Sequence, residues 1–366
     1  MRVALVHDWL VTYRGGEKVL DAMCEAFPDA ELFTLIHQRG TMSARIESRP
    51  IHTSWLQQVP GIHARYRHLL PVLPAAVASL QIPGCDLVVS SSHCVAKGVP
   101  IPSGARHLSY VHAPMRYMWD RFDDYFGPQR ASLPVRAAAR MVRPALQRWD
   151  VRSSRGIDRI FANSANIAQQ IRRVWHRDAQ VLHPPVELDR FTALDPLASG
   201  RGGYFLWLGA LAPYKRVDVA IAAFARTGLP LWIAGSGQES LTGLPPNVRV
   251  LGQVPDAQVP ELFWNARALV FPGEEDFGLT PIEAQACGRP VIALGRGGVL
   301  ETTSTRTALY FDPSDPEALA AALLDFDRFE ACFDPTEARR GALRFTRQAF
   351  IQGLRGAAEE LVSRPS

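Results

Sequence analysis

A strand, a short loop and a helix follow one another between residues 268 and 288. The apolar run Ala268-Leu269-Val270-Phe271 predicts a buried strand, and Pro272-Gly273 is a turn signal that ends it. The segment from Ile282 to Ala286 has helical character and stops at Gly288, because glycine suits a helix C-terminus. In an open parallel sheet, the loop between such a strand and helix lies at the ligand crevice.

Two carboxylates bracket this loop and the start of the helix. Glu275 lies in the loop and Glu283 on the first helical turn, so each could accept hydrogen bonds from sugar hydroxyls. Backbone N–H groups at the helix start would point at an anion, in line with the helix dipole. An alternative stays open, since Thr280-Pro281-Ile282-Glu283 also fits a capping box with Thr280 as N-cap. That alternative leaves Glu275 unexplained.

Size and composition favour a globular protein of two domains. The chain has 366 residues, 47% of them hydrophobic and 21% charged. Its five cysteines are scattered without a C-x-x-C pair, which favours a reducing compartment and disfavours a disulfide framework or a zinc site. A strand, Val3–Val6, begins at once without signal-peptide organisation, and no apolar run approaches the roughly 20 residues that span a bilayer. We therefore expect a cytoplasmic protein.

Basic residues gather in two stretches. Between Arg130 and Arg159 the sequence has eight arginines and two acids, and a long helix is expected from about Leu133 to Ser153. The second stretch, residues 63–68, precedes the apolar residues 69–74. Either stretch could be a solvated helix face or a peripheral surface for anionic lipid or a lipid diphosphate, because basic and apolar residues lie side by side. Nucleic acid is disfavoured, since no helix-turn-helix, zinc-finger or RNP pattern is present.

Three predicted strand ends carry candidate site residues in the N-terminal half. Gly15-Gly16 follows the first strand, where glycine permits close backbone approach, although an ordinary tight turn is the alternative. His112 ends the predicted strand Arg106–His112, which places it at the crevice of a parallel sheet. Asn163 follows a later strand, either as a loop residue of the site or as a cap of the next helix.

The stretch from Glu275 to Glu283 resembles the E-x7-E signature of retaining glycosyltransferases of family four. The resemblance continues through Ala284–Ile292 and Gly297–Glu301 and covers most of the chain. It implies an α/β fold of the GT-B architecture, with two facing Rossmann-like domains and an inter-domain cleft. The implied domains are an acceptor-side domain, 1–186, completed by the C-terminal helix 339–366, and a nucleotide-sugar-binding domain, 187–338. We expect a linker over 192–203 and a final amphipathic helix from about Arg339 to Leu361.

The same resemblance implies roles for individual residues. His112 would contact the donor sugar and track with catalysis, Glu275 would hold the hexose hydroxyls, and Glu283 would bind the ribose. Lys215-Arg216 resembles the diphosphate clamp, in which a lysine supplies a compact positive charge. The sequence departs from the family at Ala210, where many members have an arginine. The other implied donor-binding residues are Gly15, Gly16, Val254, Phe277, Gly278, Leu279 and Thr280.

The segment Tyr110–Trp119 resembles the branch that uses GDP-mannose for lipid-linked polysaccharides. The implied reaction is retaining transfer of a hexose, mannose from GDP-mannose, to a glycan or a polyprenyl-diphosphate-linked saccharide. We expect no metal and no cofactor beyond the nucleotide-sugar co-substrate, because Asp120-Arg121-Phe122-Asp123-Asp124 does not match a D-x-D motif. The alternatives are an epimerase or phosphorylase on this fold and a non-catalytic sugar-nucleotide-binding protein. The missing G-x-G-x-x-G disfavours a nicotinamide dehydrogenase.

Overall fold

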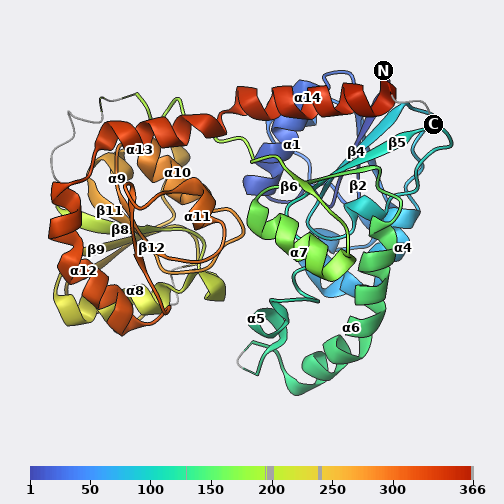
Figure 1. Cartoon of the computed structure of the whole chain (residues 1–366). Helices are drawn as coiled ribbons and strands as arrows, with labels where there is room; N and C mark the ends of the chain where they lie inside the picture. Colours follow the sequence, from blue (N-terminus) through green and yellow to red (C-terminus); the bar gives the residue numbers. More distant parts are fainter. Residues whose placement is uncertain (129, 194, 196–201, 238–240, 364–366) are drawn as a thin grey trace. The chain divides into compact units, whose positions relative to one another are not determined.

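The chain folds into two compact units, shown in Figure 1 as a computed structural model. Residues 1–128, 130–193, 195, 202–237 and 241–363 are described by the structure. The first unit comprises residues 1–185 together with 347–366, and the second comprises 186–346. The first unit is therefore discontinuous in sequence.

The first unit is built on a parallel sheet. Within the described residues it has seven strands in the order β3-β2-β1-β4-β5-β6-β7, and neighbouring strands run parallel. The chain adds β2 and β3 on one side of β1 and then places β4 on the other side. The topological switch point, where ligands bind in open α/β sheets, thus lies between β1 and β4. The strands are β1 (Val3–His7), β2 (Glu31–Thr34), β3 (Ile51–Thr53), β4 (Leu87–Ser92), β5 (Arg106–Val111), β6 (Arg159–Ala162) and β7 (Gln180–Val181).

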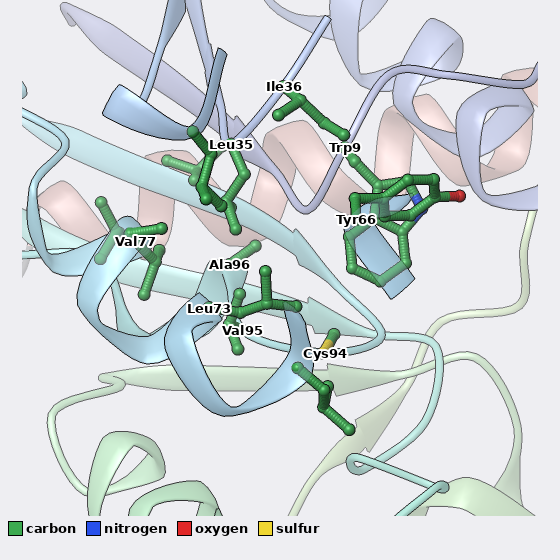
Figure 2. Packing of buried hydrophobic residues seen from close by; sticks show 14 of the residues in the cluster. Trp9, Leu35, Ile36, Tyr66, Leu73, Val77, Cys94, Val95 and Ala96 are labelled. Atoms are coloured by element: carbon green, nitrogen blue, oxygen red, sulfur yellow. The ribbon is translucent and has the colours of Figure 1, made fainter. Parts of the chain in front are cut away.

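Helices cover both faces of this sheet, which explains why β4 is buried along its whole length and β1 is buried at every residue but its first. On one face, α1 packs against α14, with Leu20, Phe350 and Leu354 in one buried cluster. On the other face, Trp9, Tyr66 and residues of α4 form a second cluster (Figure 2). The helices are α1 (Gly15–Ala26), α2 (Ala44–Glu47), α3 (Ile62–Arg65), α4 (Leu73–Ala78), α5 (Phe122–Phe126), α6 (Leu133–Ser154), α7 (Ala165–Trp175) and α14 (Arg347–Ser363).

The second unit repeats this design. Its described part has six strands in the order β10-β9-β8-β11-β12-β13, again with parallel neighbours. Its switch point lies between β8 and β11. The strands are β8 (Tyr204–Leu208), β9 (Leu231–Ala234), β10 (Val248–Gly252), β11 (Ala266–Phe271), β12 (Val291–Leu294) and β13 (Ala308–Phe311). The helices are α8 (Val217–Thr227), α9 (Val259–Trp264), α10 (Leu279–Ala286), α11 (Val299–Thr302), α12 (Pro316–Ala331) and α13 (Pro335–Ala342).

The two parallel α/β sheets confirm the predicted fold class, but the prediction of one continuous final helix is wrong. The final helix is not continuous from Arg339, because a 3₁₀ turn and an extended Thr346 separate α13 from α14. Phe345 explains the interruption, since its ring is buried against Phe277 and its carbonyl accepts from Val186 N–H. Residues 339–346 therefore belong to the second unit.

The linker predicted over 192–203 lies partly outside the described residues. Val186, Leu188 and Phe191, which precede it, are already buried in the core of the second unit. The chain passes from one unit to the other at 185/186 and again at 346/347. Among the helices of the described part, none is both long and apolar enough to cross a membrane.

The buried His107 on β5 predicts a pH-dependent stability of the first unit. Its Nε2 lies 2.9 Å from the Ser90 hydroxyl, and burial lowers the pKa of His107 to about 4. In the unfolded chain the pKa of His107 has its ordinary value of about 6.5. Between pH 6.5 and pH 4 the unfolded chain therefore binds more protons than the folded protein, so the free energy of unfolding falls as the pH drops through this range. The loss attributable to His107 should reach about 3 kcal/mol at pH 4.

Urea unfolding of the protein and a His107→Gln variant across this pH range checks the expectation. Other histidines titrate in both proteins, so the difference between the two curves isolates His107. The stability difference should shrink by about 3 kcal/mol on acidification. Parallel curves would contradict it.

Candidate functional site

An ion pair joins the two loops at the switch point of the second sheet. Lys215, in the loop after β8, donates from Nζ to Oε1 of Glu275, in the loop after β11, at 2.6 Å. Both side chains are largely buried, with 16% and 18% of their surfaces exposed. Two residues that are 60 positions apart in sequence therefore meet at the crevice position that the fold provides.

Close backbone approaches fix these loops. A Cβ on Gly273 would lie 2.2 Å from the Tyr214 carbonyl oxygen and 2.6 Å from Lys215 Cα, so only glycine permits this contact. On the other side of the Glu275 loop, Gly298 N–H donates to the Glu275 carbonyl at 2.9 Å. The loops after β8, β11 and β12 are thus held against one another around the ion pair.

The surroundings keep Lys215 charged. Burial lowers the pKa of Lys215, but the Glu275 carboxylate outweighs this effect, with smaller contributions from Tyr214 and Glu283, and the pKa lies above its ordinary value. Glu283, on α10, is therefore close enough to act on the ammonium group electrostatically. Glu275 contacts this lysine directly, and Glu283 adds a smaller electrostatic effect that raises the pKa of Lys215.

The capping-box alternative for Thr280 is wrong. Helix α10 begins at Leu279 with Gly278 as its N-cap, and no side chain caps it. Gly278 has φ +89°, a left-handed conformation that glycine adopts without strain. Leu279 and Thr280 lie on the first turn and are partly exposed. The start of the helix thus leaves its backbone N–H groups without a side-chain cap.

Three other predicted donor-binding residues do not take part in the Lys215–Glu275 ion pair. Phe277 is 4% exposed and packs against Phe345, which indicates that its ring stabilises the core of the second unit. Val254 follows β10 and is partly buried against the same core. Arg216, the N-cap of α8, directs its guanidinium to the Asp218 carboxylate and to Ser314, each at 3.2–3.3 Å. Its charge is therefore shared with Asp218.

His112 lies at one end of a series of polar contacts in the first unit, two of which are hydrogen bonds of Ser91. The Ser91 hydroxyl, at the end of β4, lies 2.9 Å from His112 Nε2 and 3.0 Å from His7 Nδ1. Because a hydroxyl has one proton, it can donate to only one of these nitrogens, and the other must carry an N–H. His7 Nε2 lies 3.7 Å from Glu17 Oε1, and Glu17 Oε2 accepts from Arg14 N–H at 2.9 Å. This series of contacts spans the switch point between β1 and β4.

A buried carboxylate organises the loop beside these histidines. Asp8 accepts four backbone N–H bonds from His93, Cys94, Val95 and Ala96, at 2.6–3.0 Å. Burial raises the pKa of Asp8, but His93, His7 and the amides outweigh it and hold that pKa below its ordinary value. Asp8 also contacts His93 Nδ1 at 3.1 Å. The ionised Asp8 carboxylate therefore holds the loop after β4 in place.

His112 itself is partly exposed and neutral. Burial of its ring, then His93 and His7, hold the pKa of His112 well below its usual value. Its carbonyl accepts from Asn163 Nδ2 at 3.0 Å, while Ser164 caps α7. The alternative in which Asn163 caps the helix is therefore wrong.

The predicted glycine pair begins α1 beside the same rings. Helix α1 starts at Gly15, and a Cβ on Gly16 would lie 3.8 Å from His7 Cε1 and 4.0 Å from His112 Cε1. These are ordinary van der Waals distances. Gly16 therefore lies beside His112, but a larger residue than glycine would also fit at this position. His7, Asp8, Glu17, Ser91 and His93 were not predicted from the sequence. The available signals were the strand ends His7-Asp8 and Ser90–Ser92.

Comparisons with known proteins support the family suggested by the E-x7-E pattern. Residues 202–326 match the family described as "Glycosyl transferases group 1". D-inositol 3-phosphate glycosyltransferase of Streptomyces scabiei is 32% identical over 47% of this chain and 46% of that protein. O-antigen chain mannosyltransferase B of Escherichia coli is 33% identical over 33% of this chain and 36% of that protein. The chain thus matches less than half the length of these curated relatives.

Solved structures support the fold along the whole chain. Anabaena Alr3699/HepE in complex with UDP has a TM-score of 0.70 at 16% identity and covers 99% of this chain and 100% of its own. Sucrose-phosphate synthase from Thermosynechococcus elongatus has a TM-score of 0.72 at 18% identity, covering 99% of both chains. The two parallel-sheet α/β domains are those of GT-B glycosyltransferase structures.

Proposed function

We propose that the chain is a retaining glycosyltransferase that moves a hexose, mannose from GDP-mannose, to a glycan or lipid-linked saccharide. The observation that carries the proposal is the Lys215–Glu275 pair at the switch point of the second sheet, with Glu283 close by. The pair lies within the segment that matches glycosyl transferases group 1. The E. coli relative, named an O-antigen chain mannosyltransferase, supports the choice of mannose.

In this proposal Lys215 binds the donor diphosphate. A phosphate oxygen would compete with Glu275 for the ammonium group, and the released carboxylate would accept hydrogen bonds from hexose hydroxyls. Lysine suits this place because its charge is compact and stays in place as charge develops on the leaving phosphate. Glu283 would accept from the ribose hydroxyls. Neutral His112 is proposed to contact the donor sugar with the ring nitrogen that does not bond Ser91.

Retention follows from front-face chemistry in this proposal. The bond between the anomeric carbon and the diphosphate oxygen breaks, and the acceptor hydroxyl forms its bond on the same face. The leaving phosphate takes the acceptor proton, so no protein nucleophile is required. We propose that the reaction needs no metal, because the Asp120–Asp124 segment does not match D-x-D.

Calorimetric titration of GDP-mannose, UDP-glucose and UDP-N-acetylglucosamine into the protein with chelator tests the proposal. We expect GDP-mannose to bind and Glu283→Ala to weaken it by about tenfold or more, since hydrogen bonds to a charged group contribute about 1.5–3 kcal/mol. Glu261→Ala, on α9, is the matched control and should bind as the parent does.

Each other outcome has a defined meaning. A preference for a uridine donor would retain the glycosyltransferase and remove mannose. Binding that appears only with added metal would overturn the mechanism. Turnover of the sugar nucleotide without acceptor would favour the epimerase alternative, and unchanged donor binding with no transfer to any acceptor would favour a non-catalytic binding protein.

A further inference from the structure

Two neutral histidines lie next to each other where neighbouring strands of the first sheet end. His93 follows β4 directly and His112 follows β5, and their ring centroids are 6.2 Å apart. Both side chains are partly exposed. Burial lowers the pKa of His93 and of His112, so each ring has one proton. The nitrogen that carries this proton donates a hydrogen bond, and the other nitrogen accepts one.

Asp8 determines which nitrogen of His93 carries the proton. The Asp8 carboxylate is fully buried, and four backbone N–H groups stabilise it as an anion. Its Oδ2 lies 3.1 Å from His93 Nδ1. A lone pair on Nδ1 would be repelled by the anion at this distance, whereas an N–H group is attracted to it. The proton of His93 therefore lies on Nδ1, and Nε2 has the lone pair.

Glu17 determines the proton position in His7. Burial raises the pKa of Glu17, but His7 outweighs this effect, with a smaller contribution from His93, so Glu17 is ionised. Its Oε1 lies 3.7 Å from His7 Nε2, a buried nitrogen that has no hydrogen-bond partner among the described residues. With one proton on its ring, His7 is most stable when Nε2 carries that proton toward the carboxylate. His7 Nδ1 then has the lone pair.

Ser91 transmits this arrangement to His112. The Ser91 hydroxyl donates its one proton to the lone pair of His7 Nδ1, at 3.0 Å. Its oxygen can then only accept from His112 Nε2, which lies 2.9 Å away and must carry the N–H. His112 Nδ1 is therefore left with the lone pair. The interior of the first unit thus binds the proton of both rings and leaves an acceptor on each.

We propose that His93 and His112 form a subsite that binds saccharide hydroxyl groups by accepting hydrogen bonds from them. Asp8 and Ser91 are its positioning residues, because each holds a ring proton on the nitrogen that it contacts. The inference rests on the proposed function, in which the donor hexose supplies the hydroxyls. A hydroxyl donates to a neutral lone pair, whereas an ionised phosphate oxygen has no proton to donate. The subsite therefore fits the hexose and not the diphosphate, which Lys215 is proposed to bind.

Nitrogen-15 NMR of the full chain with labelled histidine reads the two tautomers, because a ring nitrogen with a lone pair resonates far downfield of a protonated one. His93→Gln and His112→Gln variants assign the signals. The spectra are recorded at pH 8, where histidine side chains ordinarily have one ring proton. We expect the proton on Nδ1 of His93 and on Nε2 of His112. The opposite tautomer at either ring would overturn the proposal.

Titration with GDP-mannose shows whether the two lone pairs accept from a hexose. The signals of His93 Nε2 and His112 Nδ1 should move upfield, as a lone pair does when it accepts a hydrogen bond. GDP, which lacks the hexose, should leave both signals in place, and equal shifts with GDP would contradict the hexose contact.

Calorimetry on the same samples distinguishes failure of the subsite from failure of the proposed function. If GDP-mannose binds but neither signal moves, the subsite is wrong and the proposed function stands. If no nucleotide sugar binds, the proposed function fails and the hydroxyl contact fails with it. The tautomers are measured on the free protein in either case.

Ser91→Ala tests the positioning role, with Ser90→Ala as its matched control. Both serines are buried on β4, but Ser90 contacts His107 and Ser109 on the other face of the sheet. Ser91→Ala should give His112 a mixture of tautomers and lower kcat/KM for GDP-mannose by about two- to tenfold, the usual effect of one hydrogen bond. Ser90→Ala should leave both as in the parent.

Urea unfolding of the two serine variants separates positioning from stability. Each variant loses one buried hydroxyl, so a loss of stability alone should affect both in the same way. A Ser91→Ala protein with the parent's His112 tautomer, or a Ser90→Ala protein with the same change in tautomer and kcat/KM, would show that Ser91 does not position His112.

Discussion

A Lys215→Met variant is expected to transfer sugar about 10²–10³-fold more slowly than the parent, which is the usual cost of removing one group that stabilises a leaving oxyanion. The reason is electrostatic. Lys215 is charged and largely buried. It lies in the loop after β8 and its ammonium group contacts Glu275 in the loop after β11, where the diphosphate is proposed to bind. Methionine keeps the length of the side chain but removes the charge. The initial rate of GDP release from GDP-mannose, with a polyprenyl-diphosphate-linked saccharide as acceptor, measures the loss.

Two further variants serve as a control and a comparison for Lys215→Met. Arg226→Met removes a charge from the other end of α8, where Arg226 pairs with Glu317, and should leave the rate unchanged. Arg216→Met should reduce the rate less than Lys215→Met, because the Arg216 guanidinium is already paired with Asp218. A Lys215→Met enzyme within threefold of the parent rate would rule out the clamp.

A Lys97→Met variant is expected to destabilise the first unit by about 3–5 kcal/mol, the usual cost of breaking a buried ion pair from one side. Lys97 and Asp150 are 1% and 0% exposed, and Nζ donates to Oδ1 at 2.7 Å and to the Cys94 carbonyl at 2.9 Å. Trp119 and Trp175 donate to the other carboxylate oxygen. Without Lys97, these two N–H groups alone would stabilise a buried carboxylate. Urea unfolding followed by tryptophan fluorescence measures the change.

The double variant Lys97→Met/Asp150→Asn separates the charge from the packing. With the carboxylate also neutral, no uncompensated charge stays buried, so the double variant should be more stable than the single one. If both unfold at the same urea concentration, the loss comes from the contacts of Lys97 Nζ with the Trp149 and Trp175 rings and not from the ion pair.

The alternating strands and helices could be predicted because each carries its own local signal. The apolar run before Pro272-Gly273 became β11, and the arginine-rich segment became α6. The break between α13 and α14 could not be predicted in this way. Residues 339–361 have helical spacing throughout, and what interrupts them is burial of Phe345 against Phe277, a partner 68 positions earlier that local periodicity does not show.

Some residues of the candidate site could also be predicted from a local sequence signal, and others could not. Lys215, Glu275 and Glu283 carry a recognisable pattern, and the structure pairs Lys215 with Glu275. The capping box at Thr280 was compatible with the sequence, but the left-handed Gly278 starts the helix two residues earlier. The strand end Ser90–Ser92 was visible in the sequence, but serines are common there and nothing distinguished Ser91 from its neighbours. Its importance arises only when β1, β4 and β5 align His7, Ser91 and His112.

The position of α14 also affects how the chain is made. A ribosome completes residues 186–346 before it adds α14, yet Phe350 and Leu354 of that helix cover the apolar face of α1. At synthesis rates of about 5–20 residues per second, the roughly 320 residues between Ala26 at the end of α1 and Arg347 at the start of α14 take about 16–64 s, and the apolar face of α1 stays without this cover for that time. The unit that begins first in the sequence is therefore the last to be completed.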